Sequence, residues 1–364
     1  MKFSYFISAH GFGHAARSCA CMAAIEPFLP GVEFEIYSAV PEWFFAESLH
    51  ITYTLHPVQV DVGLVQLSPL KEDLHATLER LDHFLPFDPQ LVSDLSSSVA
   101  KAECKLLISD ISPLGLEVAA HAGVPSILVE NFTWDWIYEG YLEKEPGFQK
   151  FIDQLRTITS QANYQIQASP ACDPARNVAL VTSPISRNSQ SSRDEIRKQL
   201  KIGSEEFVLL ISMGGIPEGF TFLNQLKKYK DFRFVIPGGS STYEMDKNLI
   251  LLPHHSSFYH PDLMHACDAI IGKAGYSTIA EAYWNGVPFA FVSRPTFRES
   301  KSLGEFILNN MQGFEIKDTD FASLQWMERI SELAKLPRIR RSGLNGSAQV
   351  AQFIKSITLD LLQP

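Results

Sequence analysis

A β-strand, a glycine-containing loop and the start of a helix are predicted in Ile271-Gly272-Lys273-Ala274-Gly275-Tyr276-Ser277-Thr278-Ile279-Ala280-Glu281. The same order of elements is predicted around Ser8-Ala9-His10-Gly11-Phe12-Gly13-His14 near the start of the chain. In such a turn the first N–H groups of the helix lack partners within the helix. These N–H groups and the positive end of the helix dipole point at any ligand that lies in front of the helix N-terminus. The two stretches predict two α/β halves, each with a binding loop at the carboxyl end of a strand.

Short apolar runs alternate with helical patterns on both sides of these loops, which indicates parallel sheets covered on both faces. We expect strands at 2–8, 33–38, 52–58, 106–109, 126–129, 164–167, 207–212, 233–236, 249–252, 269–271 and 289–292. Helices are expected at 15–26, 42–49, 71–84, 89–102, 114–122, 193–200 and 349–362.

The polar stretch 182–193 is poor in apolar residues and contains a proline, so it is the best candidate for the connection between domains. We therefore predict a first domain over residues 1–183 and a second over residues 184–345. The amphipathic helix within 346–364 is expected to pack back on the first domain.

Composition limits the class of protein. The net charge of −10 argues against a nucleic-acid partner, because binding to a nucleic-acid backbone relies on clustered Lys and Arg. No apolar run approaches the length of a membrane-spanning helix, and the chain begins with a strand rather than a leader. Five cysteines without Cys-x-x-Cys spacing favour free thiols in the cytoplasm. Peripheral membrane contact and the oligomeric state stay open.

Two histidines and an aspartate are the candidates for proton transfer. His14 follows the first strand, and Asp110 ends a later apolar strand from which it can orient the histidine. The alternatives are a plain tight turn with surface histidines and an N-cap role for Asp110. His10 and the loop Gly11-Phe12-Gly13 are expected to face an acceptor molecule.

An aromatic and amide cluster follows the strand 126–129. Asn131, Trp134 and Trp136 suit a sugar or another hydroxyl-bearing acceptor, because rings stack on it and amides bond its hydroxyls. Packing in the core explains the two tryptophans equally well.

The second half carries the candidates for binding a phosphorylated donor. Gly214 and Gly215 end a strand and are expected to line the donor cleft. Lys273 and the N–H groups around Gly275, Tyr276, Ser277 and Thr278 are expected to hold a diphosphate. Glu281 lies in the first turns of the helix that follows, from which it could reach ribose hydroxyls.

A metal site is not expected. The spacing of His254, His255, His260 and His265 matches no zinc pattern, and Asp318-Thr319-Asp320 reads as a solvated turn.

In order and spacing, these residues resemble the GT-B glycosyltransferases across nearly the whole chain. The resemblance is strongest to the N-terminal glycosyltransferase-like region of plant L-arabinokinases, and extends to plant UDP-sugar transferases and to the N-acetylglucosaminyltransferase of the lipid-linked peptidoglycan precursor. It is carried by His10-Gly11-Phe12-Gly13-His14-Ala15, Ser109-Asp110, Asn131-Phe132-Thr133-Trp134-Asp135-Trp136-Ile137-Tyr138 and Gly272-Lys273-Ala274-Gly275-Tyr276-Ser277-Thr278.

The resemblance implies two Rossmann-like domains that face each other across a cleft, with the donor on the second domain and no essential metal or cofactor. His14 would be the base, Asp110 its partner and Glu281 the ribose ligand. His254 would lie against the nucleotide base, and Arg298 and Glu299 would contact the sugar. Lys273 stands where relatives carry His or Arg. The kinase module of the arabinokinases is missing, so sugar phosphorylation is not implied.

We therefore expect an inverting, metal-independent transferase that uses a nucleotide diphosphate sugar, most simply a UDP-sugar. The absence of a Glu-x7-Glu pair favours inversion. A nucleotide-sugar epimerase or hydrolase on the same fold, and a non-catalytic nucleotide-sugar-binding subunit, are the alternatives.

Overall fold

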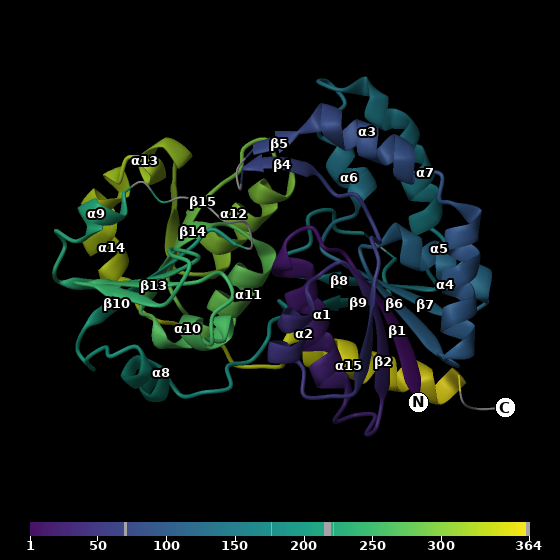
Figure 1. Cartoon of the computed structure of the whole chain (residues 1–364), viewed down its shortest axis with the longest axis horizontal. Helices are drawn as coiled ribbons and strands as arrows, with labels where there is room; N and C mark the ends of the chain where they lie inside the picture. The colour runs from purple at the N-terminus through teal and green to yellow at the C-terminus, as the bar shows by residue number, and fades with distance from the viewer. Residues whose placement is uncertain (69–70, 176, 215–219, 221, 362–364) are drawn as a thin grey trace.

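A computed structural model describes residues 1–68, 71–175, 177–214, 220 and 222–361. Within these residues the chain forms two seven-stranded sheets and one two-stranded sheet. The two large sheets belong to two lobes that lie side by side, with the second half of the chain on the left in Figure 1 and the first half on the right. Gly215 lies outside the described residues, so its predicted role has no structural counterpart here.

The first sheet has the strand order β3-β2-β1-β6-β7-β8-β9, and every pair in it is parallel. Its central strands β1, β6 and β7 are buried on both faces, which is the pattern expected of a covered parallel sheet. Their bounds are β1 Lys2–Ile7, β2 Glu33–Ser38, β3 Tyr53–Pro57, β6 Leu106–Asp110, β7 Ser126–Glu130, β8 Tyr164–Ala168 and β9 Leu180–Thr182.

Helices cover both faces of this sheet (Figure 1). Their bounds are α1 Phe12–Ile25, α2 Glu42–Ser48, α3 Leu74–Phe84, α4 Pro89–Lys101, α5 Pro113–Ala122, α6 Trp134–Glu139 and α7 Gln149–Thr159, with a 3₁₀ turn at Pro146–Phe148. The chain's last helix, α15 (Gly346–Leu361), packs in the same core, with Val350, Ala351 and Ile354 buried against residues of α1 and the first sheet.

The second sheet has the order β12-β13-β11-β10-β14-β15-β16, parallel except for β12 at its edge. Its strands are β10 Phe207–Ser212, β11 Phe232–Pro237, β12 Glu244–Asp246, β13 Leu249–Leu252, β14 Ala269–Lys273, β15 Phe289–Val292 and β16 Gly313–Ile316. Around it lie α8 Arg193–Gln199, α9 Leu223–Leu226, α10 His260–Ala266, α11 Tyr276–Asn285, α12 Glu299–Asn310, α13 Asp318–Ala322 and α14 Ile330–Lys335, with a 3₁₀ turn at Gln325–Arg329.

The expected strands are all present, and three expected helices begin three residues from the predicted start. One of them is α15, which begins at Gly346 instead of residue 349. Residues 71–73 form β5, which pairs with β4 (Val65–Ser68), and α3 starts only after Asp73 caps it through the Ala76 N–H. Helix α1 starts at Phe12 instead of residue 15, because Gly11 takes a positive φ of 75° and ends the loop early. The elements that were not predicted are the strands β4, β5, β9, β12 and β16 and the helices α6, α7, α9, α10, α12, α13 and α14.

The stretch 182–193 connects the two sheets but is not a solvated linker. Ile185 and Arg187 are both buried, and the Ile185 N–H donates to the Tyr276 hydroxyl. The proposed boundary after residue 183 stays a prediction.

Strand order decides where a ligand can bind. In the first sheet β1 lies between β2 and β6, and in the second β10 lies between β11 and β14, so the direction of winding reverses at β1 and at β10. A reversal opens a crevice at the carboxyl ends of the strands. The loops that follow β1, β6, β10 and β14 carry the residues singled out from the sequence.

Candidate functional site

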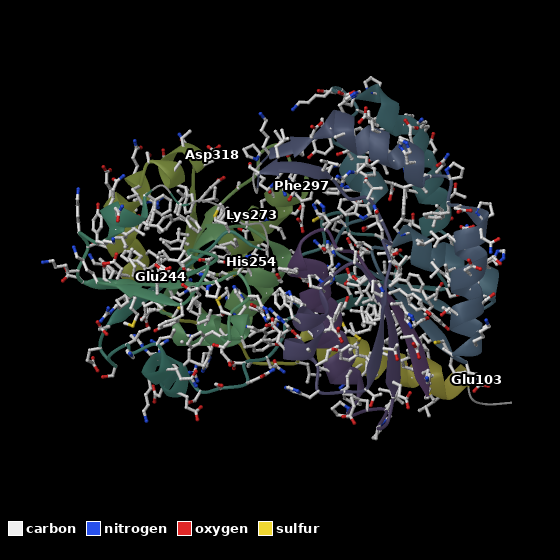
Figure 2. The ribbon with its side chains drawn as sticks, in the orientation of Figure 1. Glu103, Glu244, His254, Lys273, Phe297 and Asp318 are labelled. Carbon is white, nitrogen blue, oxygen red and sulfur yellow. The ribbon has the colours of Figure 1, made fainter. Side chains whose placement is uncertain are left out.

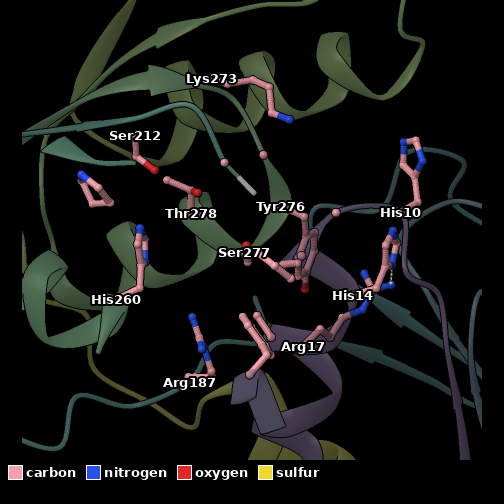
Figure 3. Close-up of a pocket in the computed structure, with 18 of the residues that line it drawn as sticks. His10, His14, Arg17, Arg187, Ser212, His260, Lys273, Tyr276, Ser277 and Thr278 are labelled. Carbon is pink, nitrogen blue, oxygen red and sulfur yellow. Dashed lines mark hydrogen bonds between the residues drawn. The ribbon is translucent and has the colours of Figure 1, made fainter. Parts of the chain in front are cut away.

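A cavity of about 190 Å³ lies between the two halves, at these strand ends. Both predicted loops line it, and Figure 3 shows His10 and His14 on one side and Lys273 and Thr278 on the other. The predicted site residues that line it are His10, Gly11, Phe12, Gly13, His14, Gly214, His254, Lys273, Gly275, Tyr276, Ser277, Thr278 and Glu299.

The N-termini of two helices, α1 and α11, face each other across this cavity. Gly11 and Gly275 occupy the cap positions, and neither helix has a side-chain cap hydrogen bond within the part of the chain that the structure describes. The two ends approach closely, since a Cβ placed on Gly13 would lie 3.7 Å from the Ser277 Oγ. Two sets of open N–H groups therefore converge on the space where a ligand would lie.

His14 and Asp110 form the predicted pair. His14 Nδ1 lies 2.8 Å from Asp110 Oδ1, although 96 positions separate the two residues in the chain. Asp110 is fully buried at the end of β6, and His14 lies in the first turn of α1 and lines the cavity. When Nδ1 carries the proton that bonds Asp110, Nε2 holds the lone pair and can act as a base.

Arg17 joins this pair as a third member; the sequence indicated that it could add charge here but did not predict its contact with Asp110. Its Nε donates to Asp110 Oδ2 at 2.8 Å and its Nη2 donates to Oδ1 at 2.6 Å. Burial alone would raise the pKa of Asp110, but Arg17 and, to a smaller extent, His14 together outweigh burial and hold that pKa below its usual value. The signal was present, because an arginine three residues after His14 lies on the same helix face.

The loop between β14 and α11 owes its shape to close contact with β10. A Cβ on Gly272 would lie 1.8 Å from the carbonyl oxygen of Ser212, so only glycine fits there. Lys273 follows it and lies beside Gly214, whose added Cβ would be 3.4 Å from the lysine Nζ. In Figure 3 this side chain points from the end of β14 toward the first half of the chain.

Glu281, the predicted ribose ligand, lies behind the residues that line the cavity. It is 1% exposed and does not line the cavity. Its Oε1 accepts hydrogen bonds from Arg187 Nε and Nη2 at 3.2 and 3.1 Å, and its Oε2 lies 2.8 Å from His260 Nδ1. Burial would raise the pKa of Glu281, but Arg187 and His260 lower it below its usual value. Arg187 and His260 are the members of this cluster that line the cavity.

Four further predicted contacts also lie outside the cavity lining. Trp134 is buried and donates from Nε1 to Asp61 at 2.8 Å, so core packing explains it. Trp136 supports Arg298, whose guanidinium lies 4.1 Å from the ring centroid, and Arg298 Nη1 also donates to Glu139 Oε2 at 2.7 Å. Neither tryptophan ring lines the cavity.

Asn131, the fourth, joins the two halves through its amide group. Its Oδ1 accepts from Arg17 Nη1 at 2.5 Å, and its Nδ2 donates to Glu299 Oε1 at 2.8 Å. Glu299 does line the cavity, and burial raises its pKa. A hydrogen-bonded path therefore runs from Glu299 through Asn131, Arg17 and Asp110 to His14.

The remaining sequence predictions concern metals and membranes. Among the residues that the structure describes, no group of three or more His, Cys, Asp or Glu side chains could hold a metal ion. Asp318-Thr319-Asp320 forms the start of α13. No helix in the described ranges has the length and apolar character needed to cross a bilayer.

Comparison with known proteins gives a family match and a related fold. Residues 203–303 match the glycosyltransferase family 28 C-terminal domain, which places β10 to β15 within that match. The chain is 27% identical to an L-arabinokinase of Arabidopsis thaliana over 99% of its own length, but it spans only 34% of that relative.

Solved structures show the fold. The glycotransferase of kitacinnamycin matches with a TM-score of 0.67 at 15% identity, covering 100% of this chain and 99% of that one. The glycosyltransferase VinC, solved with dTDP, matches at 0.60 and 15%, covering 99% and 96%. A UDP-glucosyltransferase from Polygonum tinctorium matches at 0.60 and 15%, covering 98% of each chain. The chain has the GT-B fold, as the resemblance implied.

Proposed function

We propose that this protein is an inverting, metal-independent glycosyltransferase that moves a sugar from a nucleotide diphosphate sugar, UDP-linked, to an acceptor hydroxyl. One observation carries the proposal. The hydrogen-bonded pair His14–Asp110 faces the open N-terminus of α11 across a single cavity. A base and an anion-binding helix end are the two elements that such a transfer needs.

In the proposed reaction His14 Nε2 takes the proton of the acceptor hydroxyl as its oxygen forms a bond to the anomeric carbon. The bond from that carbon to the diphosphate oxygen breaks, and its electron pair stays on the diphosphate. Asp110 stabilises the imidazolium that results. Attack from the face opposite the leaving group inverts the anomeric centre.

The leaving diphosphate would lie against the N–H groups at the start of α11, from Gly275 to Thr278, with Lys273 beside them. These groups are oriented before the reaction begins, which is how such sites stabilise developing charge. We assign charge stabilisation to these protein groups and to no metal ion.

The nucleoside would extend toward His254, His260 and Arg187, which line the cavity beyond α11. We propose that Glu281 orients this end through His260 and Arg187, and reaches the ribose only when its contact with Arg187 opens. The preference for uracil rests on the resemblance to UDP-sugar transferases. The five unpaired cysteines support a reducing compartment such as the cytoplasm.

A thermal-shift screen of UDP, GDP, dTDP, ADP and CMP tests the donor. UDP should give the largest shift, because a ligand that binds only the native state stabilises it by an amount that grows with concentration over Kd. Glu281→Gln should reduce the UDP shift, and Glu328→Gln, an exposed glutamate of the same half, is the matched control. A dominant shift with another nucleotide would contradict the UDP assignment, and an undiminished shift in Glu281→Gln would remove Glu281 from the site.

A nucleotide-sugar-binding subunit is the second candidate, favoured by the match to one third of an L-arabinokinase. Incubation with radiolabelled UDP-sugars and a panel of acceptors separates the two. Transfer to an acceptor supports the transferase. Isomerisation or release of free sugar at full rate without an acceptor supports an epimerase or hydrolase. Tight UDP binding with no turnover supports the subunit.

A further inference from the structure

Cationic side chains gather at the end of the cavity that lies beyond Lys273. Arg294 follows β15, the strand next to β14, so its side chain and that of Lys273 start from the same edge of the sheet. His10 faces both of them from the loop after β1, on the other half of the chain. Figure 2 shows Lys273 and Phe297 in the middle of the molecule, where the two halves meet.

Arg294 is buried and lacks a full set of partners. Its side chain is 4% exposed and lines the cavity, yet among the described residues its Nε has no hydrogen-bond partner. Its Nη2 lies 3.5 Å from Glu72 Oε2, a long contact, and its guanidinium lies 4.3 Å from the ring centroid of Phe297. A guanidinium is always charged, and a buried donor without a partner costs free energy, so a ligand acceptor is the natural partner for this Nε.

Ionisable side chains of both signs surround Arg294. The pKa of His10 is held well below its usual value by burial and, beyond that, by His14, Arg294 and Lys273. Two carboxyl groups face the same region. Glu72 also accepts a hydrogen bond from the Tyr141 hydroxyl at 3.0 Å. Glu299 accepts from Asn131, and burial raises the pKa of Glu299 and favours its neutral form.

We propose that Arg294, Lys273 and His10 form an anion subsite that binds a carboxylate or phosphate carried by the transferred sugar or by the acceptor. Arg294 Nε is its direct donor. The inference rests on the proposed function for its geometry: the donor diphosphate occupies the N-terminus of α11 with Lys273 beside it, and a second anion would share Lys273 and take Arg294 as its own partner. Arg suits this role because its planar fork matches carboxylate and phosphate oxygens.

The test measures Kd by calorimetry for pairs of ligands that differ in one acidic group. A lower Kd for UDP-glucuronate than for UDP-glucose would show that the subsite binds an anion on the transferred sugar. A lower Kd for glucuronate or glucose 6-phosphate than for glucose would show that the subsite binds an anion on the acceptor. These Kd values are measured with and without saturating UDP. We expect the acidic member of at least one pair to bind about 10-fold more tightly or better, the usual advantage of a charged hydrogen bond.

Variants assign that preference to Arg294. Arg294→Gln should abolish it while changing the Kd of UDP alone by less than about twofold. Arg294→Lys keeps the charge and should keep part of the preference, which covers the case in which the glutamine variant does not fold. Arg329→Gln, an arginine of the same half outside the cavity lining, is the matched control and should keep all of it.

Three results would overturn the subsite. They are equal Kd values within every pair, a preference that survives Arg294→Gln, and a loss of UDP affinity in Arg294→Gln as large as the loss for UDP-glucuronate. The last would place Arg294 at the diphosphate. Failure of the proposed function looks different, because then no nucleotide binds the unsubstituted protein, while the free sugars still report the subsite.

Discussion

Arg17 holds Asp110 by both carboxylate oxygens, at 2.8 and 2.6 Å, and both side chains are almost wholly buried. Asp110 is therefore shared between an arginine and the histidine that we propose as the base. The arrangement keeps the buried carboxylate ionised, because the charge of the guanidinium replaces the stabilisation that water gives to an exposed carboxylate. It also ties the geometry of His14 to a second residue of the same helix.

Breaking this pair should cost much of the protein's stability. Arg17→Gln leaves the charge of Asp110 without its main partner, and we expect a loss of about 3–5 kcal/mol in the free energy of unfolding, measured by urea denaturation. Asp110→Asn should cost a similar amount. The double variant should lose at least 1 kcal/mol less than the sum, as coupled neighbours do. Additive losses would show that the two residues act independently.

Acid should destabilise the protein through Asp110 and Glu281. Both carboxyl groups have a folded-state pKa below the usual value, so the unfolded chain binds protons first as the pH falls. The stability that they contribute is present above their unfolded pKa values, about 4, and is lost as the pH falls through the lower folded values. Urea unfolding from pH 7 to pH 3 should show this loss, and Asp110→Asn should flatten the curve.

The same substitution at two buried glutamates should have opposite effects. Glu281→Gln leaves Arg187 without its charge partner and should destabilise the protein by on the order of 3 kcal/mol at pH 7. Glu299→Gln removes a carboxyl whose pKa is raised by burial, while its amide oxygen can still accept from Asn131.

Glu299→Gln should therefore be neutral or stabilising at pH 7. The native state binds the proton of Glu299 more tightly than the unfolded chain does, so its unfavourable effect develops as the pH rises above about 4. Thermal melts at pH 4 and pH 7 measure it, and the gain should be confined to the higher pH. A loss of stability at pH 7 would mean that the ionised form of Glu299 is favoured in the native protein.

His14→Ala should lower the transfer rate by roughly 10²–10⁴-fold, the usual contribution of a general base, and leave the UDP shift unchanged. His121→Ala, at an exposed end of α5, is the matched control. Initial rates with the best donor and acceptor pair check this. Unchanged turnover would remove His14 from the mechanism, whereas a lost UDP shift would point to a structural role.

The sequence alone determined what depends on local patterns. Apolar runs specified the strands, and the glycines at 11, 13, 272 and 275 marked the two loops, because a buried strand and a tight turn are each written in a few consecutive residues. His14 and Asp110 could be paired in advance, since Asp110 ends one strand, His14 follows the loop after another, and the carboxyl ends of parallel strands share one edge of a sheet.

Only the tertiary structure decided which polar groups satisfy one another. Arg17 meets Asp110 from 93 positions away, Arg187 meets Glu281 from 94, and Trp134 meets Asp61 from 73. Each of these contacts follows from the requirement that a buried polar group find a partner, and many polar residues in a sequence could meet that requirement. Chain packing selects one of them. As a result, Glu281 and Trp134, which were predicted to contact a ligand, do not line the cavity. Arg187 and Arg294, which were not predicted, do line it.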